Sequence, residues 1–412
     1  MITLEQLDRD IAGWFAEVPA PRDPELVEDI LLETRDMRQR PAWTFVPFLP
    51  RPMNRSLRAR LAAALPARRL AILVVVAGLL ALAVAAAIVG SQPSLPPPFG
   101  QAGNGLVAYE KGGDILVVDP ATGQRRLLVG GPELDHFPRW SLDGERLAFI
   151  RGERHDEALV VVDAAGVVQS VSTSHLSGTD PDGIAWAPDG RTIAVVSDTG
   201  LQLFDTRTGL ATRPPVPHLG LEVHWRPPDG RELLFVGGPA QQPRLVRYSL
   251  DDGTVAEVPG TAVDVADDES FGLRPVGWTP DGRRFAYHRV SPSGRDDVTV
   301  VVDVETGDEV VLDVGYGRLS NDGTRVVGVA TDGLHEWLCV APTAGGPCQP
   351  IAGSPELVDA TGFASWQWAP DDSVIRSGGP DGRAVLLDPN GGEPQRPAWA
   401  AEGAESWQRR AH

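Results

Sequence analysis

A short segment that opens with tryptophan and contains an aspartate-glycine turn recurs along most of this 412-residue chain. Four copies match well: WSLDGERLAFI from Trp140, WAPDGRTIAVV from Trp186, WRPPDGRELLFV from Trp225 and WTPDGRRFAYH from Trp278. Two looser copies follow, LSNDGTRVVGV from Leu319 and WAPDDSVIRSG from Trp368. Successive copies start 46, 39, 53, 41 and 49 residues apart. Periods of about 40 to 50 residues with several short strands each are typical of propeller blades.

Each residue type in the motif has a structural reason to be there. Proline presets φ, aspartate accepts hydrogen bonds from its own backbone, and glycine takes a positive φ without steric cost. An alternating run such as RTIAVV then forms a strand, and a further strand ends in aspartate before a second turn, as in LQLFDTRTG at 201–209. A sheet of four such strands cannot cover its own faces, so neighbouring sheets must stack. The sequence therefore predicts an all-β propeller over residues 101–412.

The number of blades follows from counting strands. The strand after the turn occurs seven times if GLVAYE at 105–110 is included, and that copy has no tryptophan-bearing strand before it. The segment AESWQRR at 404–410 supplies such a strand at the C-terminus. Pairing these two segments would close the ring and remove an exposed sheet edge. We expect seven blades, with six as the alternative if the weak copy at Leu319 belongs to a neighbouring blade.

The repeat resembles the TolB-type, WD-like propeller repeat, whose core reads W-x-P-D-G and continues, two residues later, with an apolar residue, alanine and an aromatic residue. The resemblance covers about residues 101–410. It implies a binding scaffold but transfers no site, because the family's motif residues are structural: the tryptophan packs between blades, and the aspartate and glycine form the turn. The residues in these positions are Trp140, Asp143, Gly144, Trp186, Asp189, Gly190, Trp225, Asp229, Gly230, Trp278, Asp281, Gly282, Asp322, Gly323, Trp368 and Trp407.

An uninterrupted apolar run, LAILVVVAGLLALAVAAAIV, spans residues 70–89. As a helix it would be about 30 Å long, enough to cross a bilayer. Six arginines and no acidic residue lie in 51–69, so the positive-inside rule predicts a single-pass protein of the cell membrane with 1–69 in the cytoplasm and 101–412 outside. A buried core helix is the alternative. The Pro/Ser-rich residues 90–100 would form a stiff spacer.

Residues 1–69 are predicted to contain two amphipathic helices. Thr3 and Gln6 form a capping-box start, and a second helix opens at Asp23 with Pro24 at its first position. Helices of this size bury too little to fold strongly alone, which favours a partner. A cytoplasmic helical segment, one membrane helix and an outer domain together resemble membrane-bound anti-sigma regulators, which implies a cytoplasmic protein partner. The segment lacks the His and Cys of the zinc-type anti-sigma domain. Docking on the membrane, self-association or weak mutual packing is the alternative.

Charge and the absence of motifs limit the chemistry. Residues 1–69 carry eleven Arg against ten Asp or Glu, so the remainder of the chain carries a net charge of −20 and will repel nucleic acid. The sequence contains no nucleophile elbow, HExxH metal site, P-loop or dinucleotide fingerprint. We therefore expect no enzyme activity and no cofactor. A hydrolase or lyase site assembled in the funnel from several blades is the alternative.

Two groups of residues in the sequence are weak candidates for metal binding. His218 and His224 could converge on the central mouth, although single loop histidines are more often hydrogen-bonded or solvated. The acidic stretches DVADDES at 264–270 and TDPDG at 179–183 could bind calcium, but neither has EF-hand spacing. Aspartate among Gly and Pro is usually turn chemistry, so we expect no metal site.

Cys339 and Cys348 are the only cysteines, nine positions apart. On the oxidising outer side of a membrane we expect them to close a small structural disulfide loop. In full, the sequence predicts a membrane-anchored propeller that binds an envelope protein, peptide or glycan at its funnel and is coupled to the cytoplasmic helices. A purely structural envelope scaffold is a further alternative. The sequence predicts no identity for the ligand and no oligomeric state.

Overall fold

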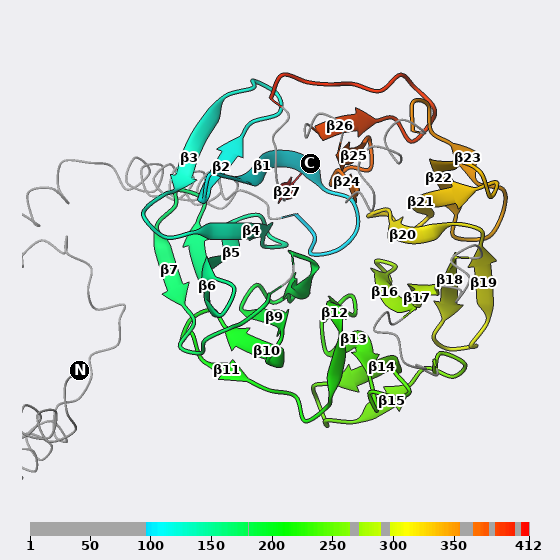
Figure 1. Ribbon diagram of the computed structural model, residues 1–412, viewed down its shortest axis with the longest axis horizontal. Coiled ribbons are helices and arrows are strands. Elements are labelled where there is room, and N and C mark those ends of the chain that lie inside the picture. The colour runs from blue at the N-terminus through cyan, green and yellow to red at the C-terminus, as the bar shows by residue number, and fades with distance from the viewer. Residues whose placement is uncertain are drawn as a thin grey trace, which may run out of the picture. The chain divides into compact units, whose positions relative to one another are not determined.

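The computed structural model describes residues 96–179, 181–263, 272–289, 297–354, 366–378, 384–399 and 405–411. These residues form seven antiparallel sheets that surround a central axis as blades (Figure 1). Within them the helical element is η2, a single 3₁₀ turn at Pro181–Gly183. The chain divides at Gln92 and Pro93, and the propeller belongs to the second unit.

The blades follow one another along the chain, except that the last strand joins the first blade. Blade 1 contains β27 (Glu405–Arg410), β1 (Gly103–Lys111), β2 (Asp114–Val118) and β3 (Arg125–Val129). Blade 2 contains β4 (Asp135–Trp140), β5 (Arg146–Glu153), β6 (Asp156–Asp163) and β7 (Val168–Val171). Blade 3 contains β8 (Ile184–Trp186), β9 (Thr192–Ser197), β10 (Gly200–Asp205) and β11 (Ala211–Thr212).

The remaining blades repeat this order. Blade 4 contains β12 (His218–Trp225), β13 (Glu232–Gly237), β14 (Arg244–Ser249) and β15 (Val255–Glu257). Blade 5 contains β16 (Leu273–Trp278), β17 (Arg284–Arg289), β18 (Val298–Asp303) and β19 (Glu309–Leu312). Blade 6 contains β20 (Gly315–Leu319), β21 (Arg325–Thr331), β22 (Glu336–Pro342) and β23 (Gln349–Pro350). Blade 7 contains β24 (Gln367–Trp368), β25 (Ile375–Gly378) and β26 (Ala384–Leu387).

The ring closes through the C-terminal strand. Trp407 of β27 lies opposite Val107 of β1, and Ser406 lies opposite Ala108. The weak copy at Leu319 forms the first turn of its own sheet, blade 6, rather than part of a neighbour. The prediction of seven blades and of closure by the ends of the domain is therefore confirmed, and the six-blade alternative is wrong.

Blade 7 departs from the four-strand pattern in the part of the chain that the structure describes. Its third strand, β26, is followed by a segment that meets it only at Leu386, which exchanges two 2.8 Å backbone hydrogen bonds with Gln395. Further along this segment, Trp399 packs edge-on against Trp407, with ring centres 6.0 Å apart. A bridge and a buried ring thus cover the edge where other blades have a fourth strand.

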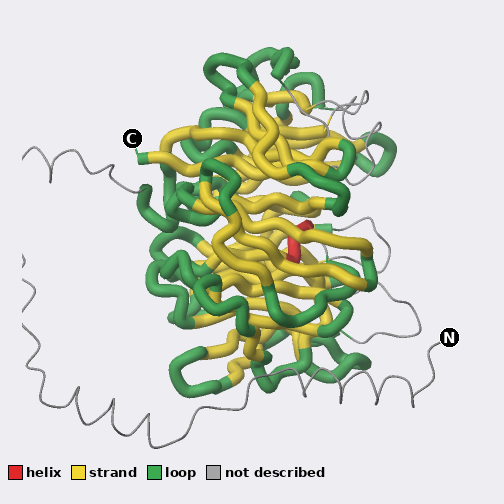
Figure 2. Tube along the Cα trace, turned by 90° about the vertical axis from the view of Figure 1, so that its left-hand side faces the viewer, coloured by secondary structure: helices red, strands yellow, loops and turns green. Residues whose placement is uncertain are grey.

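The hydrophobic core is a ring of separate clusters between blades. Each of seven clusters in the described residues draws its members from two adjacent blades, and six of them contain the repeat tryptophan of an inner strand. The middle strands are buried on both faces, as in β9, where Ile193 to Val196 are all buried. Strands covered on both faces are expected to read as continuous apolar runs. Figure 2 shows the strands crossing the body of the propeller, with loops gathered at both ends.

The predicted membrane helix at 70–89, the helices of 1–69 and most of the spacer at 90–100 lie outside the described residues. In the part of the chain that the structure describes, no helix is long and apolar enough to span a membrane.

Candidate functional site

The first strands of the blades surround the propeller axis (Figure 1). Residues of these strands line the space that we call the channel. It contains two cavities of about 410 and 480 Å³. Both cavities are lined by Arg139, His224 and Trp368 among others, so they lie next to each other. Volumes of this size are typical of small-ligand sites.

One end of the channel is walled by tryptophan, and we call it the tryptophan end. Its lining includes Trp140, Trp186, Trp225, Trp278, Trp368 and Trp407. The indole Nε1 of Trp186 donates to the carbonyl oxygen of Arg139 in the preceding blade at 3.0 Å. Trp225 and Trp368 donate in the same way to the carbonyls of Ala185 and Arg318 at 2.9 and 3.0 Å. Each of these bonds fixes the backbone of the residue that precedes the repeat anchor in the neighbouring blade.

The aspartate-glycine turns lie directly beyond this tryptophan ring. In the blade 3 turn, Asp189 Oδ1 accepts the backbone N–H of Arg191 at 2.7 Å, and Gly190 has φ of 62°. The glycine of such a turn also packs closely against the preceding blade. In blade 5, a Cβ at Gly282 would collide with the carbonyl oxygen of Pro227 in blade 4. The motif residues are thus turn and packing residues, and they present no chemically reactive group to the channel.

Blade 7 has Asp372 where the other turns have glycine. Asp372 takes the same left-handed conformation, with φ of 58°, and its side chain is almost completely buried. Its carboxylate accepts the backbone N–H groups of Asn321 at 2.7 Å and Asp322 at 2.9 Å. Aspartate tolerates this conformation better than most residues. Here it connects blade 7 to the turn of blade 6.

A chain of ion pairs crosses the channel away from the tryptophan end. Arg318 Nη2 of blade 6 lies 2.9 Å from Asp182 Oδ2, and Asp182 Oδ1 lies 3.3 Å from Arg139 Nη2 of blade 2. Arg318 Nη1 also lies 3.3 Å from Glu222 Oε2 of blade 4. Glu222 in turn lies 3.6 Å from His224 Nε2. Side chains from blades 2, 4 and 6 and from the η2 turn before blade 3 therefore meet in one network.

The contacts within the network keep Glu222 and Arg318 ionised. Burial alone would raise the pKa of Glu222, but the charge of Arg318 and the contacts with His224 outweigh burial and lower that pKa to about 2. The charge of Glu222, partly opposed by burial and supported by Asp182, raises the pKa of Arg318. Glu222 is therefore an ionised carboxylate at any physiological pH, and Arg318 is its counter-ion.

Beyond the network lies a second group of side chains from blades 5 and 6. His288 is buried, and its ring packs on Tyr316 with ring centres 4.4 Å apart. Burial, reinforced by the charge of Arg274, lowers the pKa of His288 to about 4. Arg274 lies on the inner strand β16 directly opposite His288 of β17, and it is the exposed position of an otherwise buried strand.

Residues 97–100, which we call the strap, lie across the tryptophan end. Pro98, Phe99 and Gly100 line the cavity there, and Phe99 packs against the core between blades 3 and 4. Arg409 holds the strap: its Nη2 donates to the carbonyl oxygens of Pro97 at 3.1 Å and Gly100 at 2.6 Å. Figure 1 shows this segment in cyan, crossing the centre of the ring before β1. The strap narrows this end of the channel.

The two histidines that the sequence placed together do not meet. His224 lines the channel, but His218 lies in a separate cavity of about 550 Å³, lined by loops and strands of blades 3 and 4. The two residues do not converge on the central mouth, because His218 begins β12 and His224 lies near its end. Among the described residues no group of three or more His, Cys, Asp or Glu could hold a metal ion. Asp182 of TDPDG pairs with arginines, and DVADDES at 264–270 lies outside the described residues.

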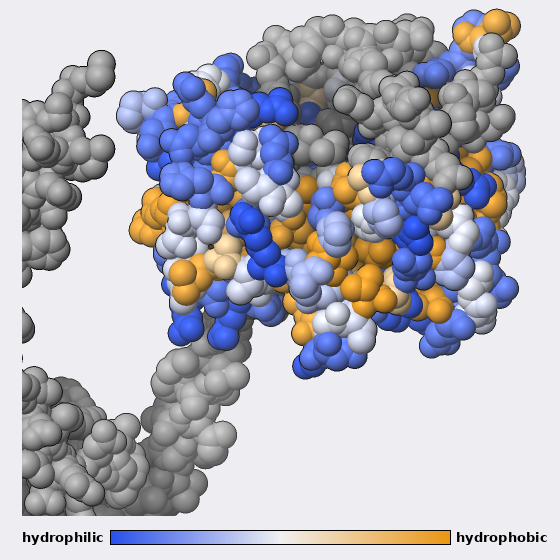
Figure 3. Space-filling view, turned by 60° about the horizontal axis from the view of Figure 1, so that its bottom comes forward, coloured by the Kyte–Doolittle hydropathy of each residue, from blue (hydrophilic) through white to orange (hydrophobic). Residues whose placement is uncertain are grey.

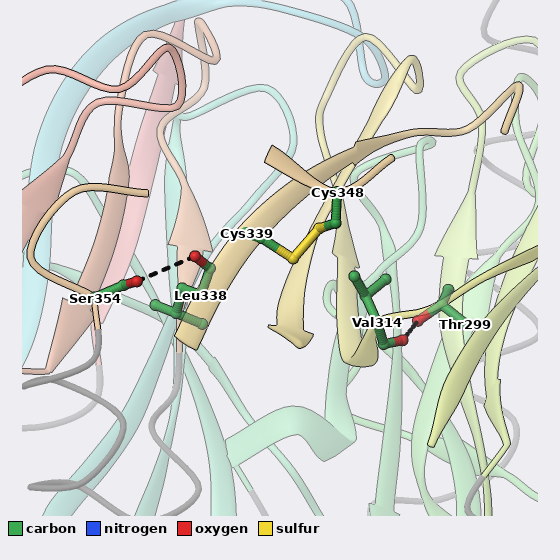
Figure 4. Close-up of a disulfide and its surroundings, with 6 residues drawn as sticks. All are labelled: Thr299, Val314, Leu338, Cys339, Cys348 and Ser354. Carbon is green, nitrogen blue, oxygen red and sulfur yellow. Dashed lines mark hydrogen bonds between the residues drawn. A yellow bond between two sulfur atoms is a disulfide. The ribbon is translucent and has the colours of Figure 1, made fainter. Parts of the chain in front are cut away.

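Cys339 and Cys348 form a disulfide in blade 6 (Figure 4). Their Cα atoms are 5.6 Å apart, within the normal range for such bridges. Cys339 lies on β22 and is buried between blades 5 and 6. The bond ties β22 to the segment that leads into β23, far from the channel network.

The motif search in the sequence did not find the channel network, because none of its residues is part of a recognised motif. Arg139, His224 and Arg318 each occupy the position immediately before the repeat anchor, where the other blades have Ala, Gly, Gln and Ser. Alternation along an inner strand directs this position toward the axis while the tryptophan enters the core. Comparing that one position between copies would have found three of the charged residues. Nothing local to the sequence marks Asp182 or Glu222.

Comparison with known proteins shows the fold alone. No protein-family model and no curated protein matches the chain. A protein of unknown function from Desulfotomaculum acetoxidans matches with a TM-score of 0.53 at 13% identity, over 74% of this chain and 99% of its own. TolB from Acinetobacter baumannii matches with a TM-score of 0.42 at 15% identity, over 75% and 81%. An oligogalacturonate lyase in complex with manganese matches with a TM-score of 0.37 at 14% identity, over 74% and 98%.

Proposed function

We propose that this protein is a membrane-anchored binding module that captures an envelope protein, peptide or glycan in its central channel, outside the membrane. The channel network carries the proposal. Repeat positions that need only packing are filled by the same residue types in most blades, whereas the position before the anchor differs between blades and contributes Arg139, His224 and Arg318. Charged side chains that meet in a cavity, on a scaffold whose other repeated residues are structural, favour recognition as their role.

The outer rim supports the channel as the binding surface. Its exposed apolar side chains are spread over several blades rather than gathered on one. They include Leu127, Val168, Leu210, Val255 and Val311, each from a different blade or the turn beside it. Figure 3 shows apolar and hydrophilic side chains mixed over the part of the rim in view. Scattered apolar residues of this kind are normal for a soluble surface and do not form a docking patch.

A photo-crosslinking experiment in native membranes tests the site. Benzoylphenylalanine at Gln367, which lines both channel cavities, should form an adduct with the ligand. The same residue at Val255, exposed on the outer strand of blade 4, is the control and should form none. Adducts at Val255 without adducts at Gln367 would replace the channel with the rim as the binding surface.

Membrane orientation is tested by labelling with an impermeant maleimide. A cysteine at Leu334, which is 87% exposed, should be labelled in intact cells. A cysteine at Ser56, within the predicted cytoplasmic segment, should be labelled only after lysis. The opposite pattern would reverse the proposed topology, and labelling of both positions in intact cells would contradict the anchor at 70–89.

The second half of the proposal concerns residues 1–69, for which we propose a cytoplasmic protein partner such as a sigma factor. The sequence carries this step through its amphipathic helices. Affinity capture with full-length protein solubilised in detergent should retain a specific partner that is lost when residues 1–69 are deleted. Failure to retain any partner would reduce the protein to an anchored binding module.

Hydrolase or lyase chemistry is the second candidate, and the convergence of Glu222, His224 and Arg318 in one cavity is the observation that favours it. The low pKa of Glu222 opposes a role as general acid, because a carboxyl ionised at neutral pH has no proton to donate. Mass spectrometry of crosslinked and released ligand distinguishes the candidates. A binding module returns its ligand intact, whereas an enzyme returns a cleaved product.

A further inference from the structure

We infer that an anionic ligand, a carboxylate or phosphate group, binds between Arg318, which lines the channel, and Arg274, which lies beside the channel on the inner strand of blade 5. This inference rests on the proposed function and names the ligand chemistry for the same channel. The first observation is the sign of the lining charge. The chain has 37 Lys and Arg against 56 Asp and Glu. Among the described residues that line the two channel cavities, basic residues outnumber acidic ones. The basic residues are Arg139, Arg318, Arg376 and Arg409, and the acidic ones are Asp182 and Glu222.

The second observation is the state of Arg274. It lies on the inner strand of blade 5 directly opposite His288, whose ring packs on Tyr316, two residues before Arg318 on β20. Within the described residues Arg274 makes no hydrogen bond or ion pair, and its side chain is exposed. Both network carboxylates already contact Arg318. Arg274 is therefore an additional cation that the network does not neutralise.

Geometry explains why an anion, rather than a cation, suits this place. Arg318 is clamped by Asp182 and Glu222, so its position is fixed before any ligand arrives. Its side chain is still 31% exposed, so a ligand can reach it. A guanidinium presents several N–H donors in a plane and binds carboxylate or phosphate in a bidentate manner. A cationic ligand would meet Arg274 without a counter-charge.

The surroundings also concentrate an anion. The strap narrows the tryptophan end of the channel. The rings of Tyr316 and buried His288 pack against each other beside Arg274, and His288 is neutral at physiological pH because its pKa is about 4. The nearest carboxylate to His288 is that of Asp297, whose Oδ2 lies 3.8 Å from Nε2. Electrostatic attraction is stronger beside low-dielectric walls than in open water. A single exposed arginine can therefore contribute more here than on the outer surface.

The test uses the full chain in detergent micelles and isothermal titration calorimetry at low ionic strength. Citrate probes carboxylate binding, inorganic phosphate probes phosphate binding, and glucose is the neutral control. We expect citrate or phosphate to bind and glucose not to bind, and the stronger of the two anions identifies the source. The variant Arg274→Ala should weaken binding about tenfold, the effect of losing one charge-assisted contact. No binding of either anion overturns the inference.

A matched variant removes the same charge elsewhere. Arg207 is exposed in a turn of blade 3, so Arg207→Ala changes the net charge equally but leaves the channel intact. We expect it to bind the anion as the wild type does. Equal losses in Arg207→Ala and Arg274→Ala would show non-specific attraction and overturn the inference. A ligand crosslinked at Gln367 that carries no acidic group would also overturn it, while leaving the channel as the binding site.

Discussion

The indole Nε1 of Trp368 donates a 3.0 Å hydrogen bond to the carbonyl oxygen of Arg318 in the preceding blade. The two residues have different kinds of role: Trp368 is a repeated packing residue, and Arg318 is the centre of the ion network in the channel. The bond fixes the backbone from which the guanidinium extends. The repeated part of the propeller therefore positions the part that differs between blades.

Replacement of Trp368 by Phe should destabilise the protein by about 1 kcal/mol more than replacement of Trp278 by Phe. Both rings are buried, and each has an arginine over its face, Arg325 at 4.9 Å and Arg226 at 5.1 Å. They differ in that Nε1 of Trp278 has no hydrogen-bond partner in the described residues. Only Trp368→Phe leaves a carbonyl without its donor, at a cost of about 1 to 3 kcal/mol. Chemical denaturation measures both; equal losses would show that the indole bond adds nothing.

Alanine at Gly282 should be far more destabilising than alanine at Gly307. Both glycines have positive φ, 66° and 75°, so both substitutions carry the same backbone strain. A Cβ at Gly282 would also collide with the carbonyl oxygen of Pro227, whereas a Cβ at Gly307 would meet nothing within 4 Å. We expect a difference of about 2 kcal/mol from overpacking. Thermal unfolding checks this, and similar melting temperatures would show that the turns do not pack between blades.

The sequence was sufficient for the fold because the fold is local and repeated. Each turn needs its aspartate and glycine, and each interface needs its tryptophan, so several copies report the same structure. Asp372 shows that even an imperfect copy keeps the geometry, since aspartate there adopts the φ of glycine. Closure was predictable because the segment around Trp407 had no partner in its own repeat, and the strand at Gly105 had none either.

The channel network was not predictable because it depends on contacts between distant residues. Asp182 and Arg318 are 136 positions apart and meet only after seven sheets have closed into a ring. Neither residue needs any particular neighbour in sequence to reach the axis. His218 and His224 illustrate the reverse case: they are close in sequence but line different cavities, because β12 shifts its register between them.

Substitution of Glu222 by Gln should destabilise the protein by about 3 kcal/mol at neutral pH. The pKa of Glu222 falls from 4.5 to about 2 on folding, and one pKa unit corresponds to about 1.4 kcal/mol. Glutamine keeps the size of the side chain but leaves Arg318 without its main counter-charge. Urea denaturation at pH 7 measures the loss.

The double variant Glu222→Gln/Arg318→Met is the control for this prediction. Removing both charges avoids an uncompensated buried ion, so the double variant should be more stable than the sum of the single losses predicts. Additive losses in the cycle would mean that the two residues do not interact.

Stability should fall as the pH drops below 6.5. The folded pKa of His288 is about 4, lower than the 6.5 of the unfolded chain, so between these values only the unfolded state takes up the proton. The same applies to His218, because burial also lowers its pKa to about 4. His288 alone should cost about 2 kcal/mol between pH 8 and pH 5. Glu222 adds a further loss below its unfolded value of 4.5, because its folded pKa is about 2.

The variant His288→Phe isolates the contribution of His288 to the pH dependence of stability. Neither ring nitrogen of His288 has a hydrogen-bond partner in the described residues, so phenylalanine should fill the site at little cost and keep the packing on Tyr316. Its stability should change less than that of the wild type between pH 8 and pH 5. Identical pH profiles would contradict the low pKa assigned to His288.

Deletion of residues 405–412 should prevent the propeller from folding. The deletion removes the inner strand of blade 1 and the ring of Trp407, which lies in the core between blades 7 and 1. It also removes contacts to blade 2: Ser406 Oγ accepts the backbone N–H of Trp140 at 3.0 Å, and Gln408 Nε2 donates to the carbonyl oxygen of Gly144 at 2.6 Å. Limited proteolysis of the full chain in detergent measures the effect.

Two milder variants serve as controls for the deletion of residues 405–412. Deletion of residues 411–412 alone leaves all of β27 in place and should give wild-type resistance to protease. Trp407→Ala keeps the strand but creates a cavity between blades 7 and 1, for a loss of about 3 to 5 kcal/mol. An open ring that resists protease as well as the wild type would show that the other six interfaces suffice. The core argues against that outcome, because each of the seven clusters in the described residues is built from two neighbouring blades.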